Sequence, residues 1–225
     1  MIEKQFKLML SDLQKLPRRN VDGKRLYETP DGSFYPSVTT ITGQMTKKAI
    51  TEWRSRVGEK KANEITRVAA ARGTSVHKLC EHYILGTMDD VKVMPSNKEM
   101  FDAMSKHLAD KVDNIKCVEG FLYSNFLRSA GQVDCIAEYD GKLSVIDFKT
   151  STKTKREEWI HDYFAQETAY AIMFQELTNL QVKKLVTIIA CETGEPQVFE
   201  IYDKFMYARK LKEYIDTYKE AYGQW

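Results

Sequence analysis

The sequence predicts a mixed α/β or α+β protein, with a central mixed sheet of about five strands flanked by helices and an N-terminal helical lobe. Two observations predict this class. Up to residue 113 the chain carries charged segments with few helix breakers, whereas strand-like segments and an Asp-Gly turn follow. The second half then runs as three strands, a helix, two strands and a helix, which is the order of a layered core of sheet and helices.

The length of 225 residues suits one sizeable core, or one domain with an inserted lobe. No internal repeat and no low-complexity linker divides the chain. We therefore treat 1–225 as a single domain. Within it we expect the helical lobe at 37–113, the sheet core at 114–202 and a closing helix at 203–225.

The N-terminal half is expected to be mainly helical. Residues 1–16 place apolar side chains on one face of a helix. Residues 17–36 hold most of the early breakers, and the stretch YPSVTTITG (35–43) indicates a short strand or an extended segment. Further helices are expected at 47–70, from the RGTS sequence at 72–75 to a C-cap at Gly86, and at 96–113.

The C-terminal half alternates strands and helices. The stretch CVEGFLYS predicts a strand, and the sequence from Gly131 to Ser151 predicts a hairpin around an Asp-Gly turn. A long helical pattern follows, then two strands joined at a Thr-Gly-Glu-Pro turn, then a helix. The expected ranges are 117–124, 131–151, 155–178, 183–202 and 203–222.

Composition excludes several classes of protein. Hydrophobic residues are 43% and charged residues 29% of the chain, as in ordinary globular proteins, and no apolar run approaches the ~18 residues of a membrane helix. Acidic residues in the first stretch disfavour a secretory signal and a mitochondrial presequence. The four cysteines include no CxxC pair, so we expect free thiols in a reducing cytoplasm and neither a zinc site nor an iron–sulfur cluster.

The hairpin brings two acids together. A two-residue loop at Asp140-Gly141 forms a type I′ turn, for which Asp-Gly is strongly favoured. That register puts Asp134 directly opposite Asp147, with Cβ atoms about 4.5–5.5 Å apart. Lys149 follows Asp147 by two residues and shares its face of the sheet.

Two carboxylates this close repel each other unless a proton or a cation lies between them. Their hard oxygen ligands suit Mg²⁺ or Mn²⁺. Lys149 beside such a site can orient or deprotonate a water, or stabilise charge on a phosphate oxygen. The alternative is an exposed sheet edge on which Lys149 merely compensates charge. The opposed register and the apolar neighbours Ile136, Val145 and Ile146 favour the metal site.

At these residues the chain resembles a known nuclease family. Gly131 and Asp134, then the turn, then IDFKTS (146–151) are similar to the PD-(D/E)XK nuclease superfamily in its RecB-like exonuclease branch. The likeness is closest to the mitochondrial genome maintenance exonucleases and their phage and bacterial relatives, and it runs from residue 35 to the helix after the hairpin. Val133 stands where the family has a nominal proline.

A second motif, RGTSVHKLCE (72–81), resembles the family's RG-T-x-x-H helix. The resemblance implies that His77 is a metal ligand or a metal neighbour, and it makes Arg72 a candidate for DNA phosphates. Glu81 lies one helical turn on from His77, where a carboxylate can hold the imidazole in one tautomer. The alternative is a lone helical histidine at the surface or at a cap.

A third motif, Gln166-x-x-x-Tyr170, resembles the family's QxxxY helix. Both side chains share one helix face, so the amide can bond a phosphate or the nucleophile while the ring packs against nucleic acid. An ordinary amphipathic helix is the alternative. On the strand before the hairpin, Glu119 is assigned a structural or surface role, with the metal as its alternative partner.

The resemblance implies a restriction-endonuclease-like core and a metal-dependent DNA exonuclease. Asp134 and Asp147 would hold one or two Mg²⁺ or Mn²⁺ ions with His77 and the backbone carbonyl of Phe148, and Lys149 would position the attacking water. Asp134, Asp147 and Lys149 are the predicted catalytic residues.

The implied substrate is DNA, with free single-stranded ends favoured and one channel wall built by the helical lobe. The implied setting is the cytoplasm of a bacterium or a phage-infected cell. Three alternatives stay open: a structure-specific endonuclease or nuclease module of a recombination complex, a catalytically silent nucleic-acid-binding subunit, and an unrelated α/β protein with a fortuitous hairpin.

Overall fold

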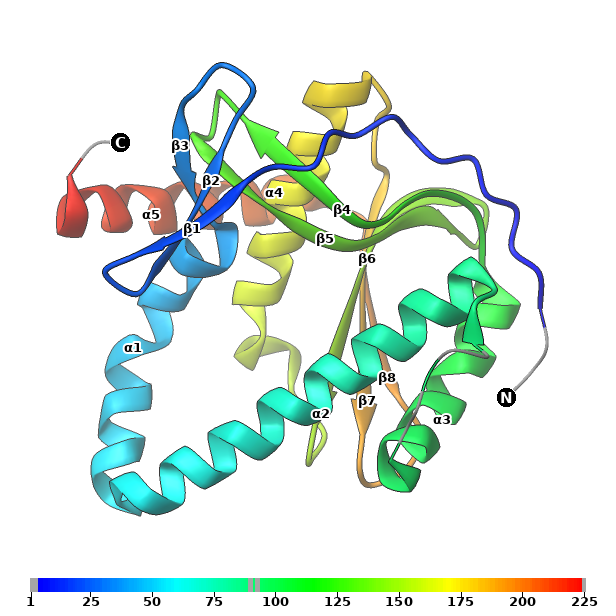
Figure 1. Cartoon of the computed structure of the whole chain (residues 1–225), viewed down its shortest axis with the longest axis horizontal. Helices are drawn as coiled ribbons and strands as arrows, with labels where there is room; N and C mark the ends of the chain where they lie inside the picture. Colours follow the sequence, from blue (N-terminus) through cyan, green and yellow to red (C-terminus); the bar gives the residue numbers. More distant parts are fainter. Residues whose placement is uncertain (1–3, 89–90, 92–93, 224–225) are drawn as a thin grey trace.

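A computed structural model describes residues 4–88, 91 and 94–223 (Figure 1). It contains a five-stranded sheet, a separate three-stranded sheet and five α-helices in that part of the chain. The strands are β1 (Arg18–Val21), β2 (Lys24–Glu28), β3 (Phe34–Pro36), β4 (Val112–Ser124), β5 (Ser129–Tyr139), β6 (Lys142–Ser151), β7 (Lys184–Cys191) and β8 (Gln197–Ile201). The helices are α1 (Val38–Val57), α2 (Glu59–Leu85), α3 (Pro95–Lys111), the short 3-10 helix η2 (Glu157–Trp159), α4 (His161–Thr178) and α5 (Lys204–Tyr222).

The large sheet has the strand order β4-β5-β6-β7-β8. β4, β5 and β6 form an antiparallel meander, β6 and β7 run parallel, and β8 returns antiparallel to β7. The parallel pair is joined through α4, because parallel neighbours need a long crossover. The predicted mixed sheet of five strands flanked by helices is confirmed.

Helices cover both faces of this sheet. Alternate residues along β5 and β6 point to opposite faces, so Cys135 and Ile146 pack with α2 and α3 while Ile136 and Val145 pack with α4 and α5. Phe148 is 2% exposed and lies on the α2 side. Burying such a ring contributes about 1.5–3 kcal/mol to the free energy of folding. Its packing with α2 holds that helix against the end of β6.

The helix predicted for 1–16 is wrong over the described residues, 4–16. This segment is extended and lies beside β4, the edge strand of the large sheet (Figure 1). Ile115 donates to the carbonyl of Lys7 at 2.8 Å and accepts from the N–H of Met9 at 2.7 Å. These bonds satisfy backbone groups that an edge strand leaves open, and they override the helical spacing of the apolar side chains. Residues 1–3 lie outside the described part.

Residues 17–36, which were predicted only as a region rich in helix breakers, form most of the small sheet. β1 and β2 form a hairpin around Asp22-Gly23, and β3 adds to β2. Asp22 and Gly23 have φ of 50° and 75°, which is the conformation of a type I′ turn. An Asp-Gly pair, which predicted the hairpin of β5 and β6, is also present here. This hairpin was not predicted because its strands are short and polar.

The helical lobe has a different internal boundary from the predicted one. α1 and α2 meet at Gly58, whose φ is 88°, and no break occurs near residue 70. α1 begins right after β3, because the hydroxyl of Ser37 caps it by accepting from the N–H of Thr40 at 3.0 Å. The C-cap predicted at Gly86 is confirmed by its left-handed backbone, with φ of 71°.

Candidate active site

The predicted hairpin register is confirmed up to the pair Cys135–Ile146. Beyond that pair the two strands separate, as β5 stays paired with β4 and β6 with β7. Asp134 and Asp147 stand where the strands part, so they do not form the ladder pair that was predicted. Instead, the Asp134 carboxylate accepts a hydrogen bond from the N–H of Phe148 at 2.7 Å. The Asp134 carboxylate thus takes the place of a backbone carbonyl of β5 as the acceptor for Phe148, and the two strands stay apart at this point.

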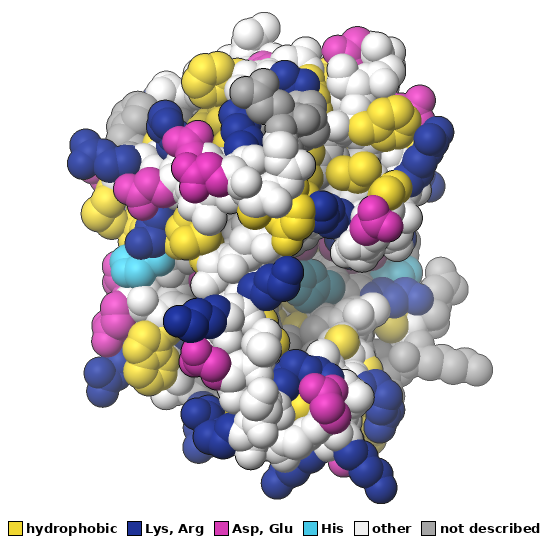
Figure 2. Space-filling view, turned by 90° about the vertical axis from the view of Figure 1, so that its left-hand side faces the viewer, with side chains coloured by type: hydrophobic (Ala, Val, Ile, Leu, Met, Phe, Trp, Pro, Cys, Tyr) yellow, Lys and Arg dark blue, Asp and Glu magenta, His cyan; other side chains and the backbone are white. Residues whose placement is uncertain are grey.

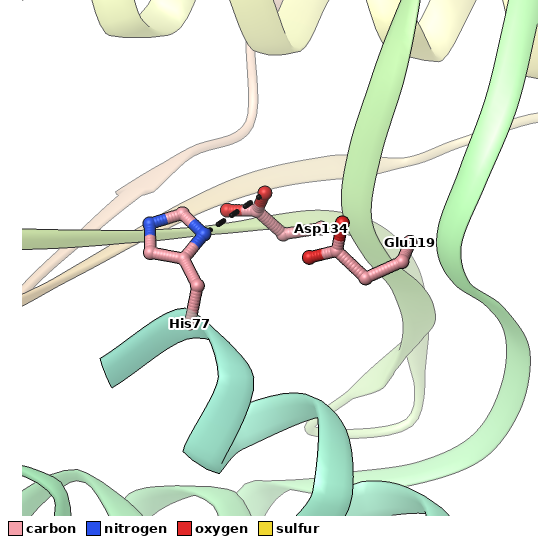
Figure 3. Close-up of side chains that lie close together, drawn as sticks. All are labelled: His77, Glu119 and Asp134. Carbon is pink, nitrogen blue, oxygen red and sulfur yellow. Dashed lines mark ion pairs between the residues drawn. The ribbon is translucent and has the colours of Figure 1, made fainter. Parts of the chain in front are cut away.

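His77 reaches this split from α2 (Figure 3). Its Nδ1 atom lies 3.3 Å from Oδ1 of Asp134. The ring also meets Phe148 edge-on, with the ring centroids 6.3 Å apart. The neighbours Val76 and Leu79 are buried against the sheet, and this anchors the turn of α2 that carries the imidazole. The sequence-predicted pairing of His77 with the hairpin acids is therefore formed with Asp134.

Glu119 completes a group of three, which brings forward the alternative that it is a metal partner rather than a structural or surface residue. One ligand atom each from His77, Glu119 and Asp134 lies within 4.8 Å of the others, and Figure 3 shows the three converging. Glu119 has φ of 50° in β4, a left-handed conformation that is uncommon outside glycine. The β4–β5 pairing brings Glu119 level with Asp134. No local sequence rule predicts that register.

Asp147 lies outside this group of three among the described residues and has its own partners. Its carboxylate is 2% exposed. It pairs with the ammonium of Lys149 and accepts from Nε2 of Gln166 at 3.2 Å. Lys149 in turn lies 5.1 Å from the ring centroid of Tyr163. Gln166 was predicted to bond a phosphate or the nucleophile, and the structure shows it holding Asp147.

The two hairpin acids have opposite electrostatic environments. Burial raises the pKa of Asp147 to about 6, and the charge of Asp134 adds to the rise against the pull of Lys149. Burial also raises the pKa of Asp134, but the positive charge and hydrogen bond of His77 outweigh it, so that the pKa is lowered from its usual value. Burial and the charge of Asp134 raise the pKa of Glu119 to about 7.

For the cationic members of the site, burial acts in the opposite direction, but the neighbouring acids outweigh it and raise both pKa values. Burial lowers the pKa of His77, but the neighbouring charge of Asp134 outweighs it and raises the net value. Burial likewise lowers the pKa of Lys149, and Asp147 and Asp134 reverse this to give a raised value. A site that raises the pKa of Glu119 while concentrating three carboxylates favours a bound cation.

These residues meet at a pocket of about 320 Å³. Its lining consists of Arg25, Tyr27, Ser37, Thr39, His77, Glu119, Gly131, Gln132, Asp134, Lys149, Gln166 and Tyr170. The small sheet and the start of α1 therefore form one wall, which the sequence did not predict. One nitrogen and two carboxylates at ligand spacing fit a divalent metal ion, since hard cations take oxygen ligands and imidazole is accepted by the transition metals.

Tyr170 lines this pocket with little of its surface exposed. It is 2% exposed, and a Cβ atom added at Gly131 would come within 2.7 Å of its Cε1 atom. Glycine at 131 is thus required by the close approach of the ring. The packing of the Tyr170 ring against nucleic acid stays a prediction.

Arg72 and Glu81 are placed differently from their predicted roles. The guanidinium of Arg72 pairs with Glu192 and donates to Oγ1 of Thr150 at 3.4 Å, so it ties α2 to the ends of β6 and β7. A DNA phosphate would compete with that ion pair. The Nδ1 atom of His77 pairs with Asp134, and no contact in the described residues supports the orienting role of Glu81.

Three curated relatives match the chain. Mitochondrial genome maintenance exonuclease 1 of Xenopus tropicalis is 30% identical over 174 residues, or 72% of this chain and 50% of that protein. The Homo sapiens protein of that name is 31% identical over 176 residues, with the same shares, and the Mus musculus protein 26% over 205 residues, or 82% and 60%. The chain has a family link to these nucleases. It spans about half the length of the curated relatives it matches.

No protein-family model matches the chain. A solved structure from Eubacterium rectale matches 65% of this chain and 64% of its own chain at 10% identity. Its TM-score of 0.43 is too low to support a shared fold or function. The three vertebrate relatives are named as mitochondrial and give no support to the predicted bacterial or phage source. In the described residues, no helix is long and apolar enough to cross a membrane.

Proposed function

We propose that this protein is a metal-dependent DNA exonuclease of the PD-(D/E)XK superfamily, in its RecB-like branch. One observation carries the proposal: His77, Glu119 and Asp134 converge at ligand spacing in the pocket that also holds Lys149. The named activity of the relatives, exonuclease, is the activity that such a cluster performs on a phosphodiester.

The proposed metal is Mg²⁺ or Mn²⁺. His77, Glu119 and Asp134 would hold it, with Asp147 and the carbonyl of Phe148 as further candidates at the split between the strands. When bound, the ion polarises a phosphoryl oxygen and lowers the pKa of its water. The imidazole nitrogen favours Mn²⁺ more than an all-oxygen site would.

Lys149 acts in the proposal as a fixed positive charge. Its raised pKa keeps the ammonium protonated. Of the three roles open to it, orienting a water and stabilising phosphate charge therefore fit better than removing a proton. Asp147 holds the ammonium in place, and Gln166 holds Asp147. This chain of contacts fixes the ammonium beside the pocket, which lowers the reorganisation needed in the transition state.

The path proposed for DNA runs between the core and the helical lobe. α1 and α2 are joined end to end, and their junction projects away from the large sheet (Figure 1). The face turned to the viewer in Figure 2 is hollowed near its middle, with Lys and Arg side chains around the hollow. Arg25, Ser37 and Thr39 bring further polar groups to the pocket. A strand enclosed in this way enters by a free end, so single-stranded ends are the proposed substrate.

The test is digestion of end-labelled linear DNA and closed circular DNA, each single- and double-stranded, with Mg²⁺, Mn²⁺ or chelator. Linear single strands should be consumed with either metal and not with chelator, while circles of the same sequence persist. Cleavage of linear strands should fall steeply with added salt, since phosphate contacts release counterions. Rapid cutting of circles would favour an endonuclease, and salt-sensitive binding without any cleavage would favour a silent binding subunit.

A further inference from the structure

The segment 152–160 joins β6 to α4, and each of these two elements carries residues of the candidate active site. It leaves β6 three residues after Lys149. It returns at the start of α4, where the ring centroid of Tyr163 lies 5.1 Å from the Lys149 ammonium. The segment is therefore connected at both ends to elements that carry Lys149 and its neighbour Tyr163.

Side chains from neighbouring elements fix the backbone of this segment. Gln197 of β8 makes two hydrogen bonds to Lys155, accepting from its N–H at 2.6 Å and donating to its carbonyl at 2.9 Å. The hydroxyl of Ser151 donates to the carbonyl of Lys153 at 2.6 Å. A surface segment held at its backbone presents its side chains in one arrangement, which reduces the entropy that a ligand must remove on binding.

An exposed tryptophan lies at the end of this segment. Trp159 is 61% exposed, although tryptophan is largely buried in most proteins. The guanidinium of Arg156 lies over its ring, 5.3 Å from the centroid. The segment also carries Lys153 and Lys155, so its three basic residues outnumber the two acidic ones, Glu157 and Glu158.

Glu158 offsets part of this positive charge, since its carboxylate lies 3.5 Å from Arg156. Both of these side chains are well exposed, at 62% and 70%, so the pair is solvated and weak. A phosphate can replace Glu158 at small cost. Lys153 is exposed and keeps its ammonium available to the same ligand.

We propose that residues 153–159 form a nucleotide platform, in which one base of a single strand stacks on Trp159 while adjacent phosphates contact Lys153 and Arg156. This inference rests on the proposed nuclease function and deepens it by naming the contact for the nucleotide next to the phosphate at Lys149. Aromatic rings between basic side chains are the usual surface for sequence-independent binding of single strands. A cation stacked on the ring adds to that attraction.

The experiment compares wild type, Trp159→Ala, Trp159→Phe and Phe126→Ala by fluorescence anisotropy in chelator, which prevents cleavage. Phe126 is the matched control, because it is 84% exposed and lies beside the C-terminal end of α4. The probes are a labelled oligo-dT and an abasic strand of equal length. Trp159→Ala should bind oligo-dT about tenfold more weakly, the size of one lost base stack, and should bind the abasic strand like wild type.

Trp159→Phe should recover most of the affinity, and Phe126→Ala should lose none. The platform is overturned if Trp159→Ala binds oligo-dT as wild type does, which would leave the ring as a surface for another class of molecule, or if it weakens both strands equally. A parallel cleavage assay of wild type and Asp147→Ala in Mn²⁺ judges the proposed function separately. Cleavage with no Trp159 effect rejects the platform alone, and a base-dependent Trp159 effect without cleavage rejects the nuclease alone.

Discussion

Two lysine–carboxylate pairs lie on the same sheet, and one of them lies at the candidate active site. Lys149 pairs with Asp147 within β6, and Lys184 of β7 pairs with Glu200 of β8 at 2.9 Å. Both lysines have an aromatic ring close to the ammonium, since Tyr163 lies 5.1 Å from Lys149 and Tyr139 lies 4.5 Å from Lys184. By residue type alone the two pairs look equivalent.

The pairs differ in which partner is buried. Lys184 is 1% exposed and Glu200 is 30% exposed, so the carboxylate keeps water and also accepts from Tyr202 at 2.8 Å. In the other pair Asp147 is 2% exposed, and it is the lysine that reaches the pocket. A buried carboxylate with a second acid nearby is under electrostatic stress that one lysine does not relieve, and a metal ion would relieve it.

Their pKa values express the same contrast. Burial raises the pKa of Asp147 to about 6. Burial also raises the pKa of Glu200, but the hydrogen bonds from Lys184 and Tyr202 outweigh it and lower the net value. The Lys184–Glu200 pair is satisfied within the protein, whereas the raised pKa of Asp147 marks the pair at the split strands as a candidate for binding a cation.

The largest expected effect is on catalysis by the hairpin acids. Asp147→Ala or Asp134→Ala should reduce metal-dependent cleavage at least a hundredfold, on the order of losing a group that fixes transition-state charge. Stability in chelator should hold or rise for Asp147→Ala, because burial and the charge of Asp134 raise the pKa of that carboxyl. It should fall for Asp134→Ala, which removes the acceptor of the Phe148 N–H and the partner of His77. Single-turnover cleavage and thermal melts with and without Mg²⁺ measure both effects.

Glu200→Gln is the matched control for these variants. It should cleave at the wild-type rate, since Glu200 lies outside the pocket lining. If an Asp147→Ala variant kept more than a few per cent of the activity, the contrast between the two pairs would lose its functional meaning.

The next effect separates the two lysines. Lys149→Ala should lower the cleavage rate roughly a hundredfold while changing the Kd for DNA by a fewfold, because the ammonium acts on charge that develops in the transition state. Lys184→Met should do the reverse, costing about 2 kcal/mol of stability and leaving the rate alone. Urea unfolding and binding in chelator provide the two readouts. An equal fall in affinity and rate for Lys149→Ala would make it a phosphate anchor.

A smaller effect is expected for the metal cluster. His77→Ala and Glu119→Gln should each raise the metal concentration for half-maximal cleavage about tenfold or more, on the order seen when a metal site loses a supporting group. Mn²⁺ should serve the wild type at least as well as Mg²⁺, because imidazole suits the softer ion. Titration of rate against each metal checks this. Unchanged curves for Glu119→Gln would remove it from the ligand set.

The sequence predicted those features that local chemistry decides. The Asp-Gly turn fixed the register of β5 and β6, which led to Asp134, Asp147 and Lys149, and the helical spacing of Gln166 and Tyr170 put both on one face of α4. Local rules also missed little in the C-terminal half, where strands are strongly apolar and helices are long.

Features that depend on contacts between residues far apart in the sequence could not be predicted from local patterns. Glu119 joins His77 only because β4 pairs with β5 and carries a left-handed residue at that point. The segment 4–16 has helical spacing, yet the open edge of β4 determines its conformation. The role of Arg72 likewise depends on Glu192, which is 120 residues away in the sequence. No local pattern encodes these contacts.

The smallest expected effect is a difference in how stability depends on pH. Glu119 keeps its proton in the folded protein up to about pH 7, whereas the unfolded chain releases it near the usual value of 4.5. The folded state therefore binds more protons in that window, and stability falls there as pH rises. In chelator, Glu119→Gln should gain stability relative to wild type from pH 4.5 to 7 and then keep a constant margin.

Glu200→Gln should show the opposite trend. The lowered pKa of Glu200 means that the folded state releases its proton first, so its contribution is fully present above pH 4.5 and is lost as the pH falls through the folded pKa. The variant should therefore lose stability relative to wild type as pH rises. Urea unfolding of the three proteins from about pH 2.5 to 8 covers both windows, the Glu200 slope below pH 4.5 and the Glu119 slope above it. Parallel curves would mean that Glu119 and Glu200 have similar environments, and the contrast between a stressed site and a satisfied ion pair would not hold.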